Sequence, residues 1–186
     1  MEHARAHGYP VPAARALTDT DIVMGRAEGP TMLGDMMRNP RRMRRHAAML
    51  AMLLDRLHAI PAPDWLPSLL GEGDALLHLD MHPENVILTA SGPVVIDWPN
   101  AARGPAAADV AHTWIVLACS LPPEDPLKRM VAFGGRRLFL TLFLRNYSRA
   151  DLRTHLAAVG DHRTANRTLP PGELESIRKL VDRNRS

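Results

Sequence analysis

Two short apolar stretches, Val86–Leu88 and Val94–Ile96, are separated by a turn at Ser91-Gly92. Short apolar runs joined by a glycine-containing turn predict a β-hairpin, with its strands at 86–88 and 93–97. A third strand is predicted at 75–77, so the polar segment 78–85 is a loop between strands, and Pro83 keeps it from becoming helical. We therefore expect the side chains of this loop to face the end of the hairpin, where residue 97 ends the last strand.

Most of the remaining chain has helical patterning. Apolar residues recur at three- and four-residue spacing from Met49 to Leu57, which predicts a helix from Arg41 to Ile60 that Pro61 and Pro63 end. Asn39-Pro40 is a helix-start signal, with Asn39 at the N-cap. Further helices are expected at 2–8 (a helix end closed by Gly8), 31–38 (capped by Thr31), 105–120, 124–146, 149–159 and 172–184, and two short strands at 13–17 and 21–26. The predicted fold class is α+β, with a mostly helical body.

Composition limits the class of protein. The chain has 186 residues, 46% of them apolar, which is enough for one well-buried domain. The single cysteine, Cys119, excludes an intrachain disulfide, fits a reducing compartment and lies in an apolar run where burial is expected. With no signal peptide at the N-terminus and no apolar stretch of membrane-spanning length, we expect a cytoplasmic protein without a membrane partner. An arginine cluster at 38–45 lacks interleaved aromatic residues, so we expect a solvated helix face and no nucleic-acid partner.

Asp80, Asn85 and Asp97 indicate a chemistry. A carboxylate that receives a hydroxyl proton, together with an amide and a second carboxylate that hold a metal ion on nucleotide phosphates, is what phosphoryl transfer requires. Such oxygen ligands suit Mg²⁺. Each residue alone is also an ordinary turn former, cap or strand terminus, but the order and spacing together favour the site. Alternation of His78, Asp80 and His82 permits a zinc site instead, although no further His or Cys cluster completes a ligand shell.

The motif His78-x-Asp80-x-His82-Pro83-x-Asn85, followed by Ile96-Asp97-Trp98 and by Gly104–Ala111, resembles the aminoglycoside/choline phosphotransferase family, whose fold is similar to that of protein kinases. Leu57–Pro61 and Gly8–Pro12 also look like connecting segments of that family. The likeness runs from about residue 2 to residue 120 and is most specific over 78–111. It implies an enzyme that uses ATP, or another nucleoside triphosphate, and Mg²⁺ to phosphorylate a hydroxyl of a small molecule.

The resemblance also implies residue roles. Asp80 would be the catalytic base, with His82 where protein kinases often have a phosphate-facing lysine, and Asn85 and Asp97 would ligate magnesium. Asp109 would hold the catalytic loop by accepting its backbone N–H groups, and His78 belongs to the same structural anchor. The hinge that pairs with adenine would run from Met24 through Arg26 to Ala27, with Ile87 as an apolar floor. Two positions depart from the family pattern: Leu79 stands where glycine is usual, and Pro99 where an acidic residue is common.

Half of the phosphate-binding machinery of such enzymes is not evident. No glycine precedes Gly8, and the first lysine is Lys128, so a Gly-rich loop and a strand lysine are missing ahead of the motif. We therefore expect residues 1–30 to be a small-lobe remnant with a helix end, two strands and the hinge, and residues 31–186 to be the helical large lobe. The alternative is a non-catalytic kinase-like module that binds Mg-nucleotide weakly. Apolar surface left on the remnant strands would allow self-association.

The acceptor is not identified by the sequence. Acidic residues in the C-terminal half would suit a cationic acceptor, but acidic residues are equally ordinary at helix starts. Trp98 and Trp114 would suit an acceptor pocket, but tryptophans near element ends are usually packed in the interior. The acidic residues considered are Asp151, Asp161 and Glu173–Glu175.

Overall fold

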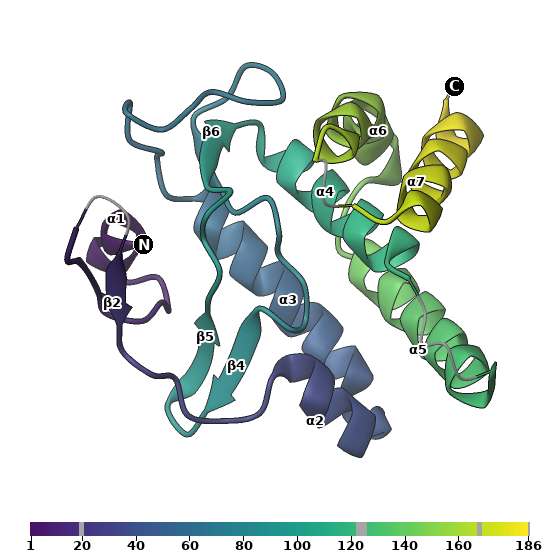
Figure 1. Ribbon diagram of the computed structural model, residues 1–186, viewed down its shortest axis with the longest axis horizontal. Helices are drawn as coiled ribbons and strands as arrows, with labels where there is room; N and C mark the ends of the chain where they lie inside the picture. The colour runs from purple at the N-terminus through teal and green to yellow at the C-terminus, as the bar shows by residue number, and fades with distance from the viewer. Residues whose placement is uncertain (19–20, 122–125, 167–168, 186) are drawn as a thin grey trace.

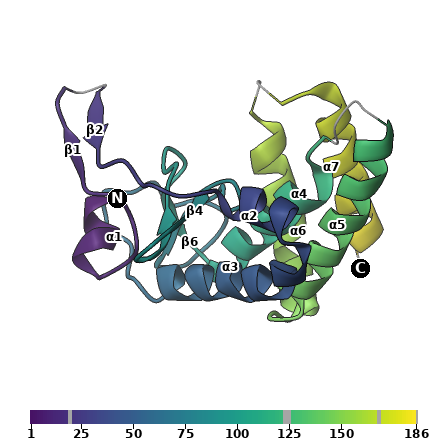
Figure 2. The same ribbon diagram turned by 90° about the horizontal axis from the view of Figure 1, so that it is seen from below.

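The computed structural model describes residues 1–18, 21–121, 126–166 and 169–185. Helices α3–α7 form the larger part, and three small pairs of antiparallel strands lie toward the N-terminal side (Figures 1 and 2). The described elements are α1 (Glu2–Ala6), β1 (Ala14–Ala16), β2 (Ile22–Met24), α2 (Met32–Arg38), the 3₁₀ turn η1 (Pro40–Arg42), α3 (Met43–His58), β3 (Ala75–Leu77), β4 (Val86–Thr89), β5 (Gly92–Val95), β6 (Ala102–Gly104), α4 (Ala106–Cys119), α5 (Pro126–Leu144), α6 (Arg149–Thr164) and α7 (Pro171–Asn184). This α+β arrangement agrees with the predicted class.

The strands form three separate antiparallel pairs, β1–β2, β3–β6 and β4–β5. The predicted hairpin is β4–β5, with Val86 opposite Val95 and Thr89 opposite Gly92. Strand β6 was not predicted from the sequence; it pairs with β3 so that Leu77 lies opposite Ala102. Within β6, only three residues pair, and their sequence Ala-Arg-Gly carries no strand pattern. Long-range pairing with β3 therefore decides this element.

Helix α3 supplies the centre of the core. Its residues Leu50, Leu53, Leu54 and Leu57 are fully buried, as the apolar spacing predicted. Helix α4 is buried on all sides and lies between α6, α5 and α7 in the helical half of the molecule (Figure 1). Trp98, Trp114 and Cys119 are also buried, in line with their expected packing roles. No described helix is long and apolar enough to span a membrane.

The start of α3 differs in detail from the prediction. Residues 40–42 form the 3₁₀ turn η1, and the α-helix begins only at Met43. The Asn39 side chain does not cap this turn, because its Nδ2 donates to Asp35 Oδ1 at 3.0 Å instead. Thr31 caps α2 as predicted, with its hydroxyl accepting the Gly34 N–H at 3.0 Å. The arginines of the 38–45 cluster are exposed.

Helix α6 is longer than predicted, reaching Thr164 where the sequence suggested an end near residue 159. Gly160 lies inside the helix, and a Cβ atom there would come within 2.8 Å of Val181 Cγ2 on α7. The glycine therefore serves close packing of α6 on α7 and is not a helix terminator. The predicted break at Pro122-Pro123 lies outside the described residues.

The N-terminal segment is fastened to the hairpin and to α3. The Tyr9 hydroxyl donates to the Leu53 carbonyl at 2.9 Å, and the Val95 N–H donates to the Pro10 carbonyl at 2.7 Å. On the opposite edge, the Leu88 N–H donates to the Pro30 carbonyl at 2.9 Å. The β4–β5 hairpin thus lies between two segments from the first thirty residues, while β1–β2 projects away from the helical half (Figure 2).

Candidate functional site

The loop after β3 is held by one buried carboxylate. Asp109, in the first turn of α4, is fully buried, and its two oxygens accept the backbone N–H groups of His78 at 2.9 Å and Leu79 at 2.8 Å. His58, at the end of α3, places its Nε2 3.0 Å from the same carboxylate. Burial raises the pKa of Asp109, but the His58 contact and the His78 N–H outweigh it, so the pKa is lowered overall. Charge-assisted hydrogen bonds of this kind are stronger than neutral ones, so the backbone at the start of the loop, at His78 and Leu79, is held firmly in place.

Leu79 has a left-handed backbone at this origin, with φ of 55°, and its side chain is 1% exposed. Glycine adopts such a conformation without the steric cost that a Cβ atom brings. The positive φ therefore explains in steric terms why glycine would suit this position better than leucine. The Leu79 side chain packs in a small second core with Ala75, Leu77 and Ala102, which offsets the cost of the backbone.

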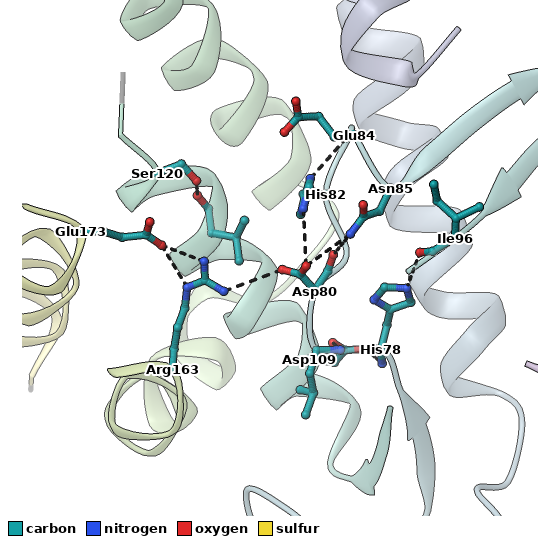
Figure 3. A network of polar contacts seen from close by, with 12 residues as sticks. His78, Asp80, His82, Glu84, Asn85, Ile96, Asp109, Ser120, Arg163 and Glu173 are labelled. Atoms are coloured by element: carbon teal, nitrogen blue, oxygen red, sulfur yellow. Dashed lines mark hydrogen bonds and ion pairs between the residues drawn. The ribbon is translucent and has the colours of Figure 1, made fainter. Parts of the chain in front are cut away.

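Asp80 lies where contacts from three directions meet (Figure 3). The Asn85 Nδ2 donates to the Asp80 carbonyl at 2.9 Å and approaches the Oδ2 atom at 3.4 Å. His82 Nε2 lies 3.7 Å from Oδ2, and Arg163 Nη1 lies 3.7 Å from Oδ1. Burial raises the pKa of Asp80, but His82, His112 and Arg163 together outweigh burial and lower the pKa. The carboxylate is therefore ionised and able to accept a proton from a neighbouring hydroxyl.

His78 faces the other way. It is fully buried, its Nε2 lies 3.1 Å from the Ile96 carbonyl, and its ring meets Trp98 edge-on with the centroids 4.7 Å apart. Burial lowers the pKa of His78, so the ring is neutral near pH 7. His78 and His82 thus do not converge, and within the described ranges no three His, Cys, Asp or Glu side chains form a metal cluster. The zinc alternative loses its geometric basis.

Asn85 and Asp97 occupy adjacent strand ends. The Ile96 N–H donates to the Asn85 backbone carbonyl at 3.0 Å, which brings the residue before Asp97 beside the residue before β4. The Asn85 amide nitrogen points toward Asp80 (Figure 3), so its oxygen is directed elsewhere. Asp97 is exposed and has φ of 67°, an uncommon conformation that is concentrated at functional sites. One amide and one carboxylate oxygen at neighbouring strand ends fit Mg²⁺, which takes its other ligands from water and phosphate.

The residues that follow the predicted hinge lie beside the β4–β5 hairpin. Met24 is the last residue of β2, Arg26 is exposed, and Ala27 is partly buried. Four residues after Ala27, Thr31 forms a bridge with Ile87 of β4. A Cβ atom on Gly29, whose φ is 154°, would lie 2.1 Å from the Leu88 carbonyl oxygen. Only glycine allows this approach, and it brings the chain after Ala27 against the strand that carries Ile87.

Two further side chains contact the site: Arg163, which was not predicted from the sequence, and Glu173, which was considered there only as a contact for a cationic acceptor. Arg163 is in the last turn of α6, and its Nη2 and Nε donate to Glu173 Oε1 on α7 at 2.7 and 3.2 Å. His112 on α4 is buried nearby, its Nδ1 has no hydrogen-bond partner within the described part of the chain, and burial followed by the Arg163 charge lowers its pKa to about 4. No spacing rule links residues 80, 163 and 173. The helix predicted at 149–159 was too short to include Arg163, which lies in the last turn of α6. Glu173 has the position of an ordinary acidic residue at a helix start.

Comparison with known proteins gives one family match. The sequence model of the phosphotransferase enzyme family matches residues 63–153, a little under half of the chain, including β3, the 78–85 loop and the hairpin.

Short local similarity is also found to the thiamine kinases of Salmonella newport (strain SL254) and Salmonella heidelberg (strain SL476). Each is 42% identical over 41 residues, which is 22% of this chain and 15% of the relative. The chain thus matches about 15% of the length of these relatives. The segment that carries the candidate site is thus similar to the phosphotransferase enzyme family.

Proposed function

We propose that the protein transfers the γ-phosphoryl group of ATP, or another nucleoside triphosphate, to a hydroxyl of a small molecule. The observation that carries this proposal is the hydrogen bond from the Asn85 side chain to the Asp80 carbonyl. Both residues lie on a loop whose first backbone N–H groups, at His78 and Leu79, donate to Asp109. Asp97 comes two residues after β5, the partner strand of β4, and the Ile96 N–H before it donates to the Asn85 carbonyl. The family match over residues 63–153 supports the same reaction class.

In the proposed reaction, the acceptor oxygen forms a bond to the γ-phosphorus while the bond from that phosphorus to the bridging oxygen breaks, and the nucleoside diphosphate leaves. Asp80 orients the hydroxyl and takes its proton, a role that its lowered pKa allows at neutral pH. His82 lies on the Oδ2 side of Asp80, where its ring would face the transferred phosphate. Charge stabilisation by groups already in place is the main source of rate in such reactions.

Asn85 and Asp97 are the residues we propose for the metal. Mg²⁺ bound there would neutralise charge on the nucleotide phosphates. Asn85 is held by its own Nδ2 contacts to Asp80, so a ligand and the base are linked rigidly. For the nucleotide base, we propose backbone pairing along Met24–Ala27, with Arg26 at the edge and Ile87 beneath. The close approach of Gly29 to β4 supports this placement.

The proposed architecture follows from these assignments. Residues 1–30, with α1, β1, β2 and the hinge, would correspond to part of a small lobe, and residues 31–186 to a kinase-like large lobe. Contacts of Pro10 and Pro30 with the two edges of the hairpin support a nucleotide site at this boundary.

A test separates turnover from binding. ADP release is measured with Mg-ATP and a panel of hydroxyl acceptors that includes thiamine, aminoglycosides, choline and sugars. We expect Asp80→Asn to lower kcat by about 10²–10⁴-fold, as loss of a general base does. Asp97→Ala should abolish the thermal stabilisation that Mg-ATP gives to the wild type. Asp182→Asn, at an exposed residue of α7, is the control for loss of a surface carboxylate.

The outcomes distinguish the two candidates. ADP that appears with an acceptor and depends on Asp80 supports the phosphotransferase. Thermal stabilisation by Mg-ATP that depends on Asp97, with no ADP above the Asp80→Asn background for any acceptor, would favour the non-catalytic module. Absence of both signals would refute the nucleotide site itself.

A further inference from the structure

The two carboxylate oxygens of Asp80 face different parts of the molecule. Oδ2 faces Asn85 and His82, which belong to the same loop and lie toward the hairpin (Figure 3). Oδ1 faces Arg163 on α6. If the metal and phosphates lie on the Asn85 side, an acceptor hydroxyl has the Oδ1 side left to approach. The acceptor would therefore lie next to Arg163.

Arg163 is held in place and still has a donor to offer. Its Nε and Nη2 atoms both donate to Glu173 Oε1, and the two side chains are only 16% and 9% exposed. Its Nη1 lies 3.7 Å from Asp80 Oδ1, which is too long for a hydrogen bond, and it makes no other hydrogen bond within the described residues. The guanidinium is thus oriented by one end, with the other end directed at Asp80 (Figure 3). A partly buried guanidinium with an open N–H is a typical binding group for carboxylate or phosphate.

Two of the acidic side chains that would favour a cationic acceptor are paired with basic side chains, and a third lies in a different groove. Glu173 binds Arg163, and Glu175 pairs with Lys179 at 2.6 Å on an exposed stretch of α7. Asp151 lines a separate open groove with Asp55 and Tyr147. A positive group on an acceptor beside Oδ1 would meet the Arg163 charge. The surroundings of Oδ1 therefore disfavour an ammonium and favour an anion.

We propose that Arg163 determines acceptor specificity by binding an anionic oxygen group, so the substrate is a hydroxyl compound with a carboxylate or phosphate one or two carbons from the reacting hydroxyl. This rests on the proposed function. A hydroxyl bound to Oδ1 lies about 2.7 Å from that oxygen, and Nη1 lies 3.7 Å from the same atom. A group one or two bonds further along the acceptor would come within hydrogen-bonding distance of Nη1. Glu173 is the positioning residue that keeps Arg163 directed at the site.

The test uses four acceptors that share a pair of hydroxyls on adjacent carbons: glycerate, glycerol 3-phosphate, glycerol and 3-amino-1,2-propanediol. Binding is measured by calorimetry in the presence of Mg-ADP, and ADP release is measured separately with Mg-ATP. For the wild type we expect an anion to bind at least about tenfold more tightly than glycerol, because a hydrogen bond to a charged group typically gives that much or more. The amine should bind most weakly. The two anions show whether carboxylate or phosphate is preferred.

Variants assign the effect to Arg163. Arg163→Gln should remove the anion preference, while Arg163→Lys should keep part of it and Glu173→Gln should weaken it. Arg153→Gln is the matched control, since Arg153 is an exposed arginine on the same helix that contacts Asn184. Circular dichroism and the thermal stabilisation by Mg-ATP report whether each variant is folded.

The results separate the inference from the proposed function. Equal or tighter binding of glycerol or the amine, or an anion preference that persists in Arg163→Gln, overturns the inference, whether or not ADP is released. Arg163-dependent anion binding supports it. If such binding occurs while no acceptor yields ADP above the Asp80→Asn background, the anion site stands and the phosphotransferase proposal fails.

Discussion

At the residue scale, the site depends on unusual backbone at two positions, Leu79 and Asp97. Both have positive φ, and both follow a strand and lie next to a proposed functional group. Aspartate tolerates this conformation comparatively well, whereas leucine bears a steric cost of about 1–2 kcal/mol. Leu79 is retained in this conformation by its burial against Leu77 and Ala102. The two contributions can be separated by mutation.

We predict that Leu79→Gly is less destabilising than Leu79→Ala, the reverse of the usual order. Both variants lose the buried side chain, which costs about 2–5 kcal/mol for Leu→Ala. Only glycine relieves the left-handed backbone, which returns about 1–2 kcal/mol. The free energy of unfolding is measured by urea titration.

Leu77 provides the control, because it is equally buried but lies in β3 with extended backbone. There Gly should be worse than Ala by about 0.5–1 kcal/mol. The same order at both positions would contradict a steric cost at Leu79.

His112 predicts how stability depends on pH. Burial, followed by the Arg163 charge, lowers its pKa from 6.5 to about 4. Between these values the unfolded chain binds a proton that the folded chain does not, so stability falls as the pH decreases from about 6.5 to about 4. The full effect is about 3 kcal/mol. His112→Leu should flatten the curve of unfolding free energy against pH in this window, and an unchanged curve would show that other groups dominate.

At the scale of elements, the sequence predicted those that local chemistry decides. The periodic leucines gave α3, Thr31 gave the start of α2, and the Ser91-Gly92 turn gave the β4–β5 hairpin. Strand β6 was missed because its pairing with β3 depends on contacts between distant backbone segments. A Cβ atom on Gly104 would lie 2.3 Å from the Leu69 carbonyl, so this glycine is required by tertiary packing and looks like a loop residue in the sequence.

The candidate site divides in the same way. Asp80 and Asn85 lie on one loop, so their contact could be predicted from spacing, and the hairpin brings Ile96, the residue before Asp97, beside Asn85. Arg163 could not be predicted, because it reaches Asp80 only through the packing of α6 on α4 and α7. Interhelical contacts of this kind follow from side-chain shapes along whole helices, and no local pattern reports them.

We predict that Gly160→Ala destabilises the protein by about 1–3 kcal/mol, although alanine is the better helix former. The added methyl group would meet Val181 Cγ2 at 2.8 Å and Ile177 Cγ2 at 3.5 Å, so α6 and α7 must move apart. That movement would also weaken the pairing of Arg163 with Glu173. Thermal unfolding measures the stability, and the anion binding described above measures the second effect.

Gly135→Ala is the matched control on α5, where a Cβ atom would lie 3.8 Å from Met43 Cε, an ordinary contact. This variant should be stabilised by about 0.5–1 kcal/mol. Equal effects at the two glycines would show that α6 and α7 are not closely packed at Gly160.

At the scale of the whole molecule, stability is expected to be uneven. The β1–β2 hairpin has large exposed apolar side chains, with Leu17 and Ile22 each 56% exposed, whereas the leucines of α3 are buried. Regions with few buried contacts open at low free energy. Among the described elements, we therefore expect α3 to open at high free energy and the β1–β2 pair to open at low free energy.

We predict that backbone amides of β1 and β2 exchange with deuterium much faster than those between Leu50 and Leu57. Hydrogen exchange followed by mass spectrometry measures this difference. Mg-ATP should slow exchange over 22–27 and 85–97 if the nucleotide lies between the hinge and the hairpin. Slowing confined to other segments would place the nucleotide elsewhere.

The contacts of Asp109 have a consequence for biosynthesis. The carboxylate that fixes the backbone at His78 and Leu79 is thirty residues further along the chain, and Arg163 is further still. During translation the loop leaves the ribosome well before its support does, and chains are synthesised from the N-terminus at about 5–20 residues per second. The centre of the protein is consequently completed in stages, first by α4 and last by the final two helices.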